Sequence, residues 1–143
     1  MTRSSAPPAW RREVAGDPAA FRVAATEVAT AAVDLGVPAG RRDELTLAVH
    51  ELVVNAWEHG HLGAPEPPIH VEVARRDDGA VTVRVADAAV GGRWDPDVPT
   101  GPADTDRGRG LAIVRALADE VTVAAAEHRT VVTLTMSRGG AAG

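Results

Sequence analysis

The sequence has no cysteine among its 143 residues and only four aromatic side chains, Trp10, Phe21, Trp57 and Trp94. Without cysteine there are no disulfides, thiolate metal sites or thiol catalysis, as is common in a reducing cytosol. With so few aromatics, a core must be built from alanine, valine and leucine. No apolar run approaches the roughly 20 residues of a membrane helix, and the N-terminus lacks a secretory signal. We therefore expect a cytoplasmic protein with no membrane partner.

Basic side chains are too few for general nucleic-acid binding. The chain has 15 arginines and no lysine against 20 acidic residues, a net charge of −5, whereas nucleic-acid binding needs a basic surface. We expect no direct nucleic-acid partner. The length fits one domain with one core. The Ser/Pro-rich residues 1–9 are expected to be a disordered tail, residues 10–137 the domain and residues 138–143 a loose tail.

Helix signals dominate the first half of the chain. Asp17 followed by Pro18 is a typical helix start and Gly36 a typical stop, which predicts a helix over residues 18–35. Apolar residues at helical spacing predict a second helix over residues 41–59, ended by Gly60. A neighbouring stripe of this helix is polar and contains Glu44, Glu51, Asn55 and Glu58.

The pattern then changes to the period of two that is typical of strands. Strands are predicted at 10–15, 69–74, 81–86, 121–125 and 130–136, with a hairpin turn at 77–79 and a third helix over 111–119. Residues 88–107 form a long Gly/Pro-containing loop, which in a small domain indicates function or disorder. The expected fold class is α+β, a two-layer sandwich with three helices on one face of a mostly antiparallel sheet.

Three polar features carry the candidate chemistry. Glu51 and Asn55 share one helical face, where a carboxylate can orient or deprotonate a hydroxyl and an amide oxygen suits magnesium. Asp87 ends a valine-rich strand and can accept a hydrogen bond from an exocyclic amine. The Gly-Arg-Gly run at 108–110 opens a helix, where backbone N–H groups can hold phosphate. Taken singly, each is more often a solvated helix face, a turn residue or an ordinary helix start.

The order of these features resembles the GHKL ATP-binding superfamily, and within it the anti-sigma-factor serine kinase branch. The segment ELTLAVHELVVNAWEHG (44–60) is similar to the N box, DAAVGGRWDP (87–96) to the G1 box and DRGRGLAIVRALADEV (106–121) to the G2 box. The run HRTVVTLTM (128–136) resembles the last strand pair of the family. The resemblance extends over about residues 10–137, and it implies a histidine-kinase-like ATPase fold that uses ATP and Mg²⁺.

The resemblance also implies a role for each matching residue. Asn55 would hold Mg²⁺ on the nucleotide phosphates, Glu51 would be the catalytic base or would orient the attacking group, and Asp87 would pair with the adenine amine. His59 would be structural or would line the pocket. The implied nucleotide-binding set is completed by residues of the later boxes, with glycines cradling phosphate and the threonine near adenine: Gly91, Gly108, Arg109, Gly110, Leu111 and Thr130.

The implied function is that of an anti-sigma factor with serine/threonine protein kinase activity. Such a protein would sequester a sigma factor and phosphorylate a STAS-type antagonist of the anti-sigma factor. Phosphoryl transfer depends on positioning and charge neutralisation, which a magnesium ion, a glycine cradle and one carboxylate can supply. A homodimer is a further expectation from the family.

The G1 box departs from the family pattern D-x-G-x-G, because Ala89 stands at its third position. A left-handed alanine there costs about 1 kcal/mol relative to glycine and restricts the approach of adenine. This departure keeps open a second hypothesis, a non-enzymatic module that binds its partner with or without nucleotide. A detached histidine-kinase-type catalytic domain is less favoured, because no phospho-acceptor helix is recognised. A zinc site at His59 and His61 lacks a convincing third ligand.

Overall fold

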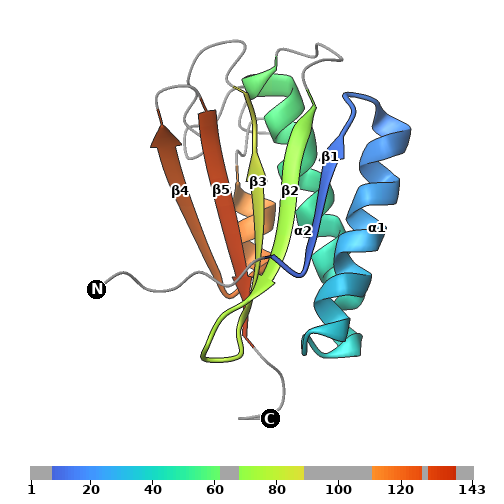
Figure 1. Ribbon diagram of the computed structural model, residues 1–143, viewed down its shortest axis with the longest axis vertical. Coiled ribbons are helices and arrows are strands. Elements are labelled where there is room, and N and C mark those ends of the chain that lie inside the picture. The colour runs from blue at the N-terminus through green and yellow to red at the C-terminus, as the bar shows by residue number, and fades with distance from the viewer. Residues whose placement is uncertain (1–7, 62–67, 89–110, 127–128, 138–143) are drawn as a thin grey trace.

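The computed structural model describes residues 8–61, 68–88, 111–126 and 129–137. Five strands form one sheet in the order β1-β2-β3-β5-β4, and every neighbouring pair is antiparallel. The strands are β1 (Trp10–Val14), β2 (Ile69–Arg75), β3 (Val81–Ala86), β4 (Glu120–Ala126) and β5 (Arg129–Met136). Helices α1 (Pro18–Asp34), α2 (Arg42–Asn55) and α3 (Ala112–Leu117) cover one face of the sheet (Figure 1). The predicted α+β sandwich is confirmed.

Helix α1 has the predicted ends. Pro18 stands in its first turn, and Gly36 follows its last turn at φ 124°, a left-handed conformation that favours glycine. Asp17 occupies the N-cap position with extended backbone, but its side chain makes no capping hydrogen bond. The start of α1 is therefore set by proline geometry more than by a capping carboxylate. Within the described residues, no helix is long and apolar enough to cross a membrane.

The single helix predicted over residues 41–59 is three consecutive elements. A 3-10 turn, η1 (Ala39–Arg41), precedes α2, and a π-helical turn, η2 (Ala56–Gly60), follows it. The N–H of His61 donates to the carbonyl of Ala56 at 3.1 Å, so the turn closes over five residues instead of four. Single π turns inside or after α-helices occur frequently at functional sites, and η2 leads directly into the site described below.

The remaining elements match the predicted ones with small shifts at their ends. The strands start or stop within two residues of the predicted bounds, and α3 is shorter than the predicted helix over 111–119. The predicted hairpin turn is present: the N–H of Gly79 donates to the carbonyl of Arg76 at 2.9 Å, and Gly79 has φ 91°. The left-handed backbone explains why glycine stands at this position.

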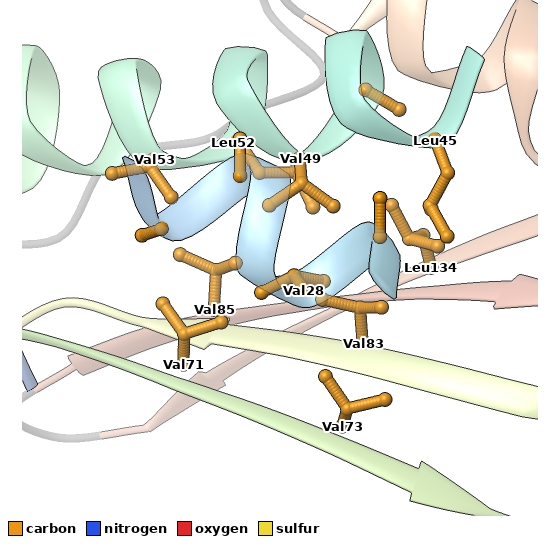
Figure 2. Close-up of a cluster of buried hydrophobic side chains, with 14 of the residues drawn as sticks. Val28, Leu45, Val49, Leu52, Val53, Val71, Val73, Val83, Val85 and Leu134 are labelled. Atoms are coloured by element: carbon orange, nitrogen blue, oxygen red, sulfur yellow. The ribbon is translucent and has the colours of Figure 1, made fainter. Parts of the chain in front are cut away.

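The core lies between the helices and the sheet and is built largely from alanine, valine and leucine, as predicted. Figure 2 shows its centre, where apolar side chains of α1 and α2 meet those of β2, β3 and β5: Val28, Leu45, Val49, Leu52, Val53, Val71, Val73, Val83, Val85 and Leu134. The rings of Phe21 and Trp57 meet edge to face, with 5.3 Å between their centroids. This packing fixes α2 against the middle of the sheet, so the ends of α2 and β3 are held at one end of the molecule.

A polar latch, made by Arg41, Asp119 and Ser137, joins the elements at the opposite end of the sheet. The Arg41 guanidinium donates to the Leu117 carbonyl at 2.8 Å and to the Asp119 carboxylate at 3.1 Å. The same Asp119 oxygen accepts the backbone N–H of Ser137 at 2.7 Å. The latch therefore ties the start of α2 to the end of α3 and to the end of β5.

Candidate functional site

The candidate site lies at the end of the sheet where β3 stops and β5 starts, at the top of Figure 1. Asp87 follows β3 directly and is only 1% exposed, because the valine-rich strand carries it inward. Its backbone N–H donates to the Thr130 carbonyl at 3.1 Å, and its Oδ1 accepts the Thr130 N–H at 3.1 Å. This pair of bonds extends the β3–β5 ladder by one step and fixes the carboxylate in place.

The π turn η2 packs against the same strand end. A Cβ atom added to Gly60 would lie 2.4 Å from Cγ and Oδ2 of Asp87, so the Gly60 backbone is directly beside this carboxylate. The next residue, His61, is fully buried, and its Nε2 accepts the backbone N–H of Ala88 at 2.9 Å. Two consecutive residues after α2 therefore contact two consecutive residues after β3.

Buried polar atoms that have no hydrogen-bond partner in the described part of the chain include Nδ2 of Asn55, at the end of α2, and Oγ1 of Thr130, at the start of β5. Leaving a buried polar group unsatisfied costs about 1–3 kcal/mol, so these atoms are candidates for contact with a ligand. An amide and a hydroxyl together with the Asp87 carboxylate fit a polar ligand with both donors and acceptors, such as a nucleotide.

The other predicted site residues fall into three groups. Glu51 lies one helical turn before Asn55 on α2 and is partly buried. Leu111 precedes α3 and is 2% exposed within the hydrophobic core, so its side chain has a packing role. Other residues of the predicted set, and the G1-box alanine, lie outside the described residues: Ala89, Gly91, Gly108, Arg109 and Gly110.

His59 lies within the π turn, directly before Gly60. It is partly buried, and this burial lowers the pKa of its imidazole below the ordinary value, which favours the neutral ring near pH 7. Neutral histidine can line a pocket without adding charge. Its expected structural or pocket-lining role stays a prediction.

A metal ion would find few protein ligands in this part of the molecule. Among the described residues there is no group of three histidine, cysteine, aspartate or glutamate side chains that could hold a metal ion. Asn55 offers one amide. A single protein ligand fits magnesium, which keeps several waters and is commonly held by one or two protein groups together with substrate phosphates.

Sequence reasoning did not single out Gly60 as a site residue, and it considered His61 only for a zinc site with His59 that lacks a convincing third ligand. Gly60 was expected to end a helix. The signal that could have indicated Gly60 is its position directly after a long amphipathic helix and shortly before a Pro/Gly-rich stretch. Such a glycine also permits close approach of another segment, here Asp87.

A single antiparallel sheet, covered on one face by helices and carrying buried polar groups at its strand ends, defines an α+β sandwich with a candidate site at one end of the sheet. The family model of the histidine kinase-like ATPase domain matches residues 14–136. The chain therefore belongs to the histidine kinase-like ATPase family, and the membership of the GHKL superfamily predicted from the sequence is confirmed.

Solved structures agree with this assignment. A chain containing the RsbU and RsbW domains of Rv1364c from Mycobacterium tuberculosis matches with 25% identity and a TM-score of 0.67, over 95% of this chain and 34% of that chain. The present chain therefore spans about a third of the length of that longer chain. The SiaB–SiaC complex from Pseudomonas aeruginosa matches with 11% identity and a TM-score of 0.61, over 90% of this chain and 89% of that chain, and shows the fold alone. No curated protein matches.

Proposed function

We propose that this protein binds ATP at the sheet end that carries Asp87 and transfers the terminal phosphoryl group to a serine or threonine of an antagonist protein. The observation that carries the proposal is the buried Asp87 carboxylate, fixed by the Thr130 N–H at 3.1 Å, in a domain of the histidine kinase-like ATPase family. A fixed, desolvated carboxylate is a strong acceptor for an exocyclic amine, the group that distinguishes adenine from guanine at that position of the ring.

The remaining roles follow from the chemistry of each side chain. When bound with the phosphates, a magnesium ion would supply charge neutralisation during transfer. Asn55 would help to hold this ion with its amide oxygen, while the Thr130 hydroxyl would bond to the base. Glu51 would orient or deprotonate the hydroxyl of the antagonist. Gly91 and the Gly-Arg-Gly run at 108–110 would approach the nucleotide through their backbone, as the family resemblance implies.

The partners belong to the same proposal. Similarity to the anti-sigma-factor kinase branch, together with the likeness to a chain that contains an RsbW domain, supports a sigma factor as the sequestered protein and a STAS-type protein as the phosphorylated antagonist. Transfer of phosphate to the antagonist would then control the release of the sigma factor. Formation of a homodimer is part of the family expectation.

Calorimetric titration with ATP and with ADP, each with and without Mg²⁺, tests the nucleotide part. Asn55→Ala should weaken Mg-ATP binding by about 10- to 100-fold, the loss expected for one bond to a charged group. Glu51→Gln should bind ATP normally but transfer phosphate to the antagonist about a hundred- to ten-thousand-fold more slowly. Equal Mg-ATP affinity in the wild type and in Asn55→Ala would remove the metal role of Asn55.

Glu44→Gln is the matched control for Glu51→Gln. Glu44 lies on the same helix but is exposed and pairs with Arg41 at 3.2 Å, far along α2 from the site. The control should leave both ATP affinity and phosphate transfer at the wild-type level. A comparable loss of transfer in Glu44→Gln would show that the effect of Glu51→Gln is a general effect of removing helix charge.

Ala89 favours a second candidate function, a partner-binding module without phosphoryl transfer. Such a module would bind the sigma factor equally well with and without nucleotide. Incubation of the protein and its antagonist with labelled ATP separates the two functions. Phosphate on a serine or threonine of the antagonist supports the kinase, whereas nucleotide binding without any transfer supports the module.

A further inference from the structure

His61 is a buried residue to which the proposed function assigns no role. It is fully buried directly after the π turn, and its imidazole lies beneath the segment that leaves β3, where Nε2 accepts the Ala88 N–H at 2.9 Å. The neighbouring Gly60 touches the Asp87 carboxylate. The contact of His61 therefore acts on the residue that follows Asp87 in the chain.

The hydrogen bond defines the protonation state of the ring. A backbone N–H can only donate, so Nε2 must carry a lone pair, and the proton of the neutral ring then sits on Nδ1. If the ring is protonated, both nitrogens become donors and the bond to Ala88 is lost. The contact therefore exists only with a neutral His61.

The π turn explains why His61 can reach Ala88. Closing the turn over five residues, from the Ala56 carbonyl to the His61 N–H, inserts one residue more than an α-helical turn would hold. Gly60 then faces Asp87 without a side chain, and His61 faces the next residue of the strand end. Two contacts hold the Asp87–Ala88 peptide from the helix side, while Thr130 holds Asp87 from the sheet side at 3.1 Å.

We propose that His61 is a positioning residue for Asp87: its neutral imidazole anchors the Ala88 N–H, keeps the carboxylate aimed at the base, and releases it when the ring is protonated. This inference rests on the proposed nucleotide site. It makes nucleotide affinity sensitive to acid. His61 itself is not among the residues assigned to the nucleotide above, and it acts through Asp87, which is.

Among the described residues, few titratable groups lie on the elements that meet here. Asp87 faces the turn from the end of β3, Glu58 and His59 belong to the turn itself, and β5 begins with the exposed Arg129 followed by the uncharged Thr130.

Nuclear magnetic resonance on the nucleotide-free protein tests the contact itself. Long-range ¹H–¹⁵N spectra should show His61 with an unprotonated Nε2 and a protonated Nδ1 at pH 8. Lowering the pH should shift the Ala88 amide resonance together with the His61 ring signals. A ring protonated on Nε2 at pH 8, or an Ala88 amide that ignores the His61 titration, overturns the inference without reference to nucleotide.

Nucleotide titration at pH 8 and pH 5.5 tests the consequence, with wild type, His61→Gln and His61→Phe. Glutamine places an acceptor near the position of Nε2 but does not titrate, so its affinity for ATP should match the wild type at pH 8. His61→Phe removes the acceptor and should bind about three- to tenfold more weakly at pH 8. Between pH 8 and pH 5.5 the wild type should lose about three- to tenfold relative to His61→Gln.

Protonation of ATP itself changes the affinity of the wild type and of His61→Gln by the same factor, so it cancels in the ratio of the two affinities. His70→Gln is the control for histidine content, because His70 is exposed on β2 beside Glu13, at 3.8 Å, and should behave as the wild type at both pH values. A constant ratio between the wild type and His61→Gln overturns the inference but leaves the proposed function intact. A wild type that binds no ATP at either pH contradicts the proposed function instead. In that case the NMR spectra alone test the hydrogen bond between His61 and Ala88.

Discussion

Gly60 is placed so close to Asp87 that a methyl group does not fit. The added Cβ of Gly60→Ala would lie 2.4 Å from Cγ and Oδ2 of Asp87, so either the carboxylate or the π turn must move. We expect the free energy of unfolding to fall by about 1–3 kcal/mol, as for other overpacked sites. ATP affinity should fall as well, because the displaced group is the proposed adenine acceptor. Denaturant unfolding and calorimetric titration measure the two effects.

Gly40 provides the matched control for this substitution. A Cβ added there meets no atom within 4 Å, and the residue lies in η1, away from the strand ends. Gly40→Ala should leave ATP affinity unchanged and keep or raise stability by about 0.4–1 kcal/mol, because alanine restricts the unfolded chain. Equal effects of the two alanines would show that Gly60 is not in close contact with Asp87.

At the scale of single residues, the sequence indicated which side chains could take part in a site but not how they are buried or what they contact. Asp87 could be predicted as a carboxylate at a strand end, yet its burial to 1% exposure depends on β5 lying beside β3. Leu111 was expected to touch the nucleotide, and the structure places its side chain in the core. His61 was considered only as a possible zinc ligand with His59, because no local pattern records that its ring reaches a residue 27 positions further along the chain.

At the scale of elements, the latch of Arg41, Asp119 and Ser137 predicts a dependence of stability on pH. Burial alone would raise the pKa of Asp119, but the Ser137 N–H and the Arg41 guanidinium favour the carboxylate, and the net result is a lowered pKa. A carboxyl with a lowered folded-state pKa stabilises the protein above its unfolded pKa of about 3.9, and this contribution is lost as the pH falls through the folded value.

Asp119→Asn therefore should destabilise the protein at pH 7 and lose this disadvantage as the pH falls below about 4. The expected difference in unfolding free energy at pH 7 is about 0.2–1 kcal/mol, because the Asp119 side chain is 39% exposed and the ion pair is screened by water. Urea unfolding at several pH values measures it. Asp77→Asn, at an exposed position of the hairpin, is the control, and an equal pH dependence in both variants would contradict the latch.

The helices and strands could be predicted where the hydrophobic period agrees with the glycine and proline residues that end an element. Period two marked the strands, and glycine with proline marked the ends of α1 and the hairpin. The separation of η2 from α2 was not predictable, because the apolar stripe of Leu45, Val49 and Leu52 in α2 continues into the buried Ala56 of η2 without a break. The π turn is selected by tertiary contacts, with Gly60 and His61 against the end of β3.

At the scale of the whole molecule, the site exists because the sheet order is not the chain order. Strand β5 lies between β3 and β4, so Thr130 is brought beside Asp87, 43 residues earlier in the chain. Periodicity predicts the strands but contains no information about their order. Only the resemblance to a known family assigned Asp87 and Thr130 to one site, and their shared role at the nucleotide stays a prediction.

Because the site is assembled from distant segments, a ligand that bridges them should stabilise the entire domain. A nucleotide at 100 times its dissociation constant adds about 2.7 kcal/mol to the free energy of unfolding, which corresponds to a rise in Tm of roughly 5–10 °C for a domain of this size. We expect this rise with Mg-ATP in the wild type and a much smaller one in Asn55→Ala or in the presence of EDTA. Thermal unfolding followed by tryptophan fluorescence measures it. A rise that is equal in the wild type, in Asn55→Ala and without Mg²⁺ would mean that the nucleotide binds without the amide and the cation, and the phosphates would then be held by other groups.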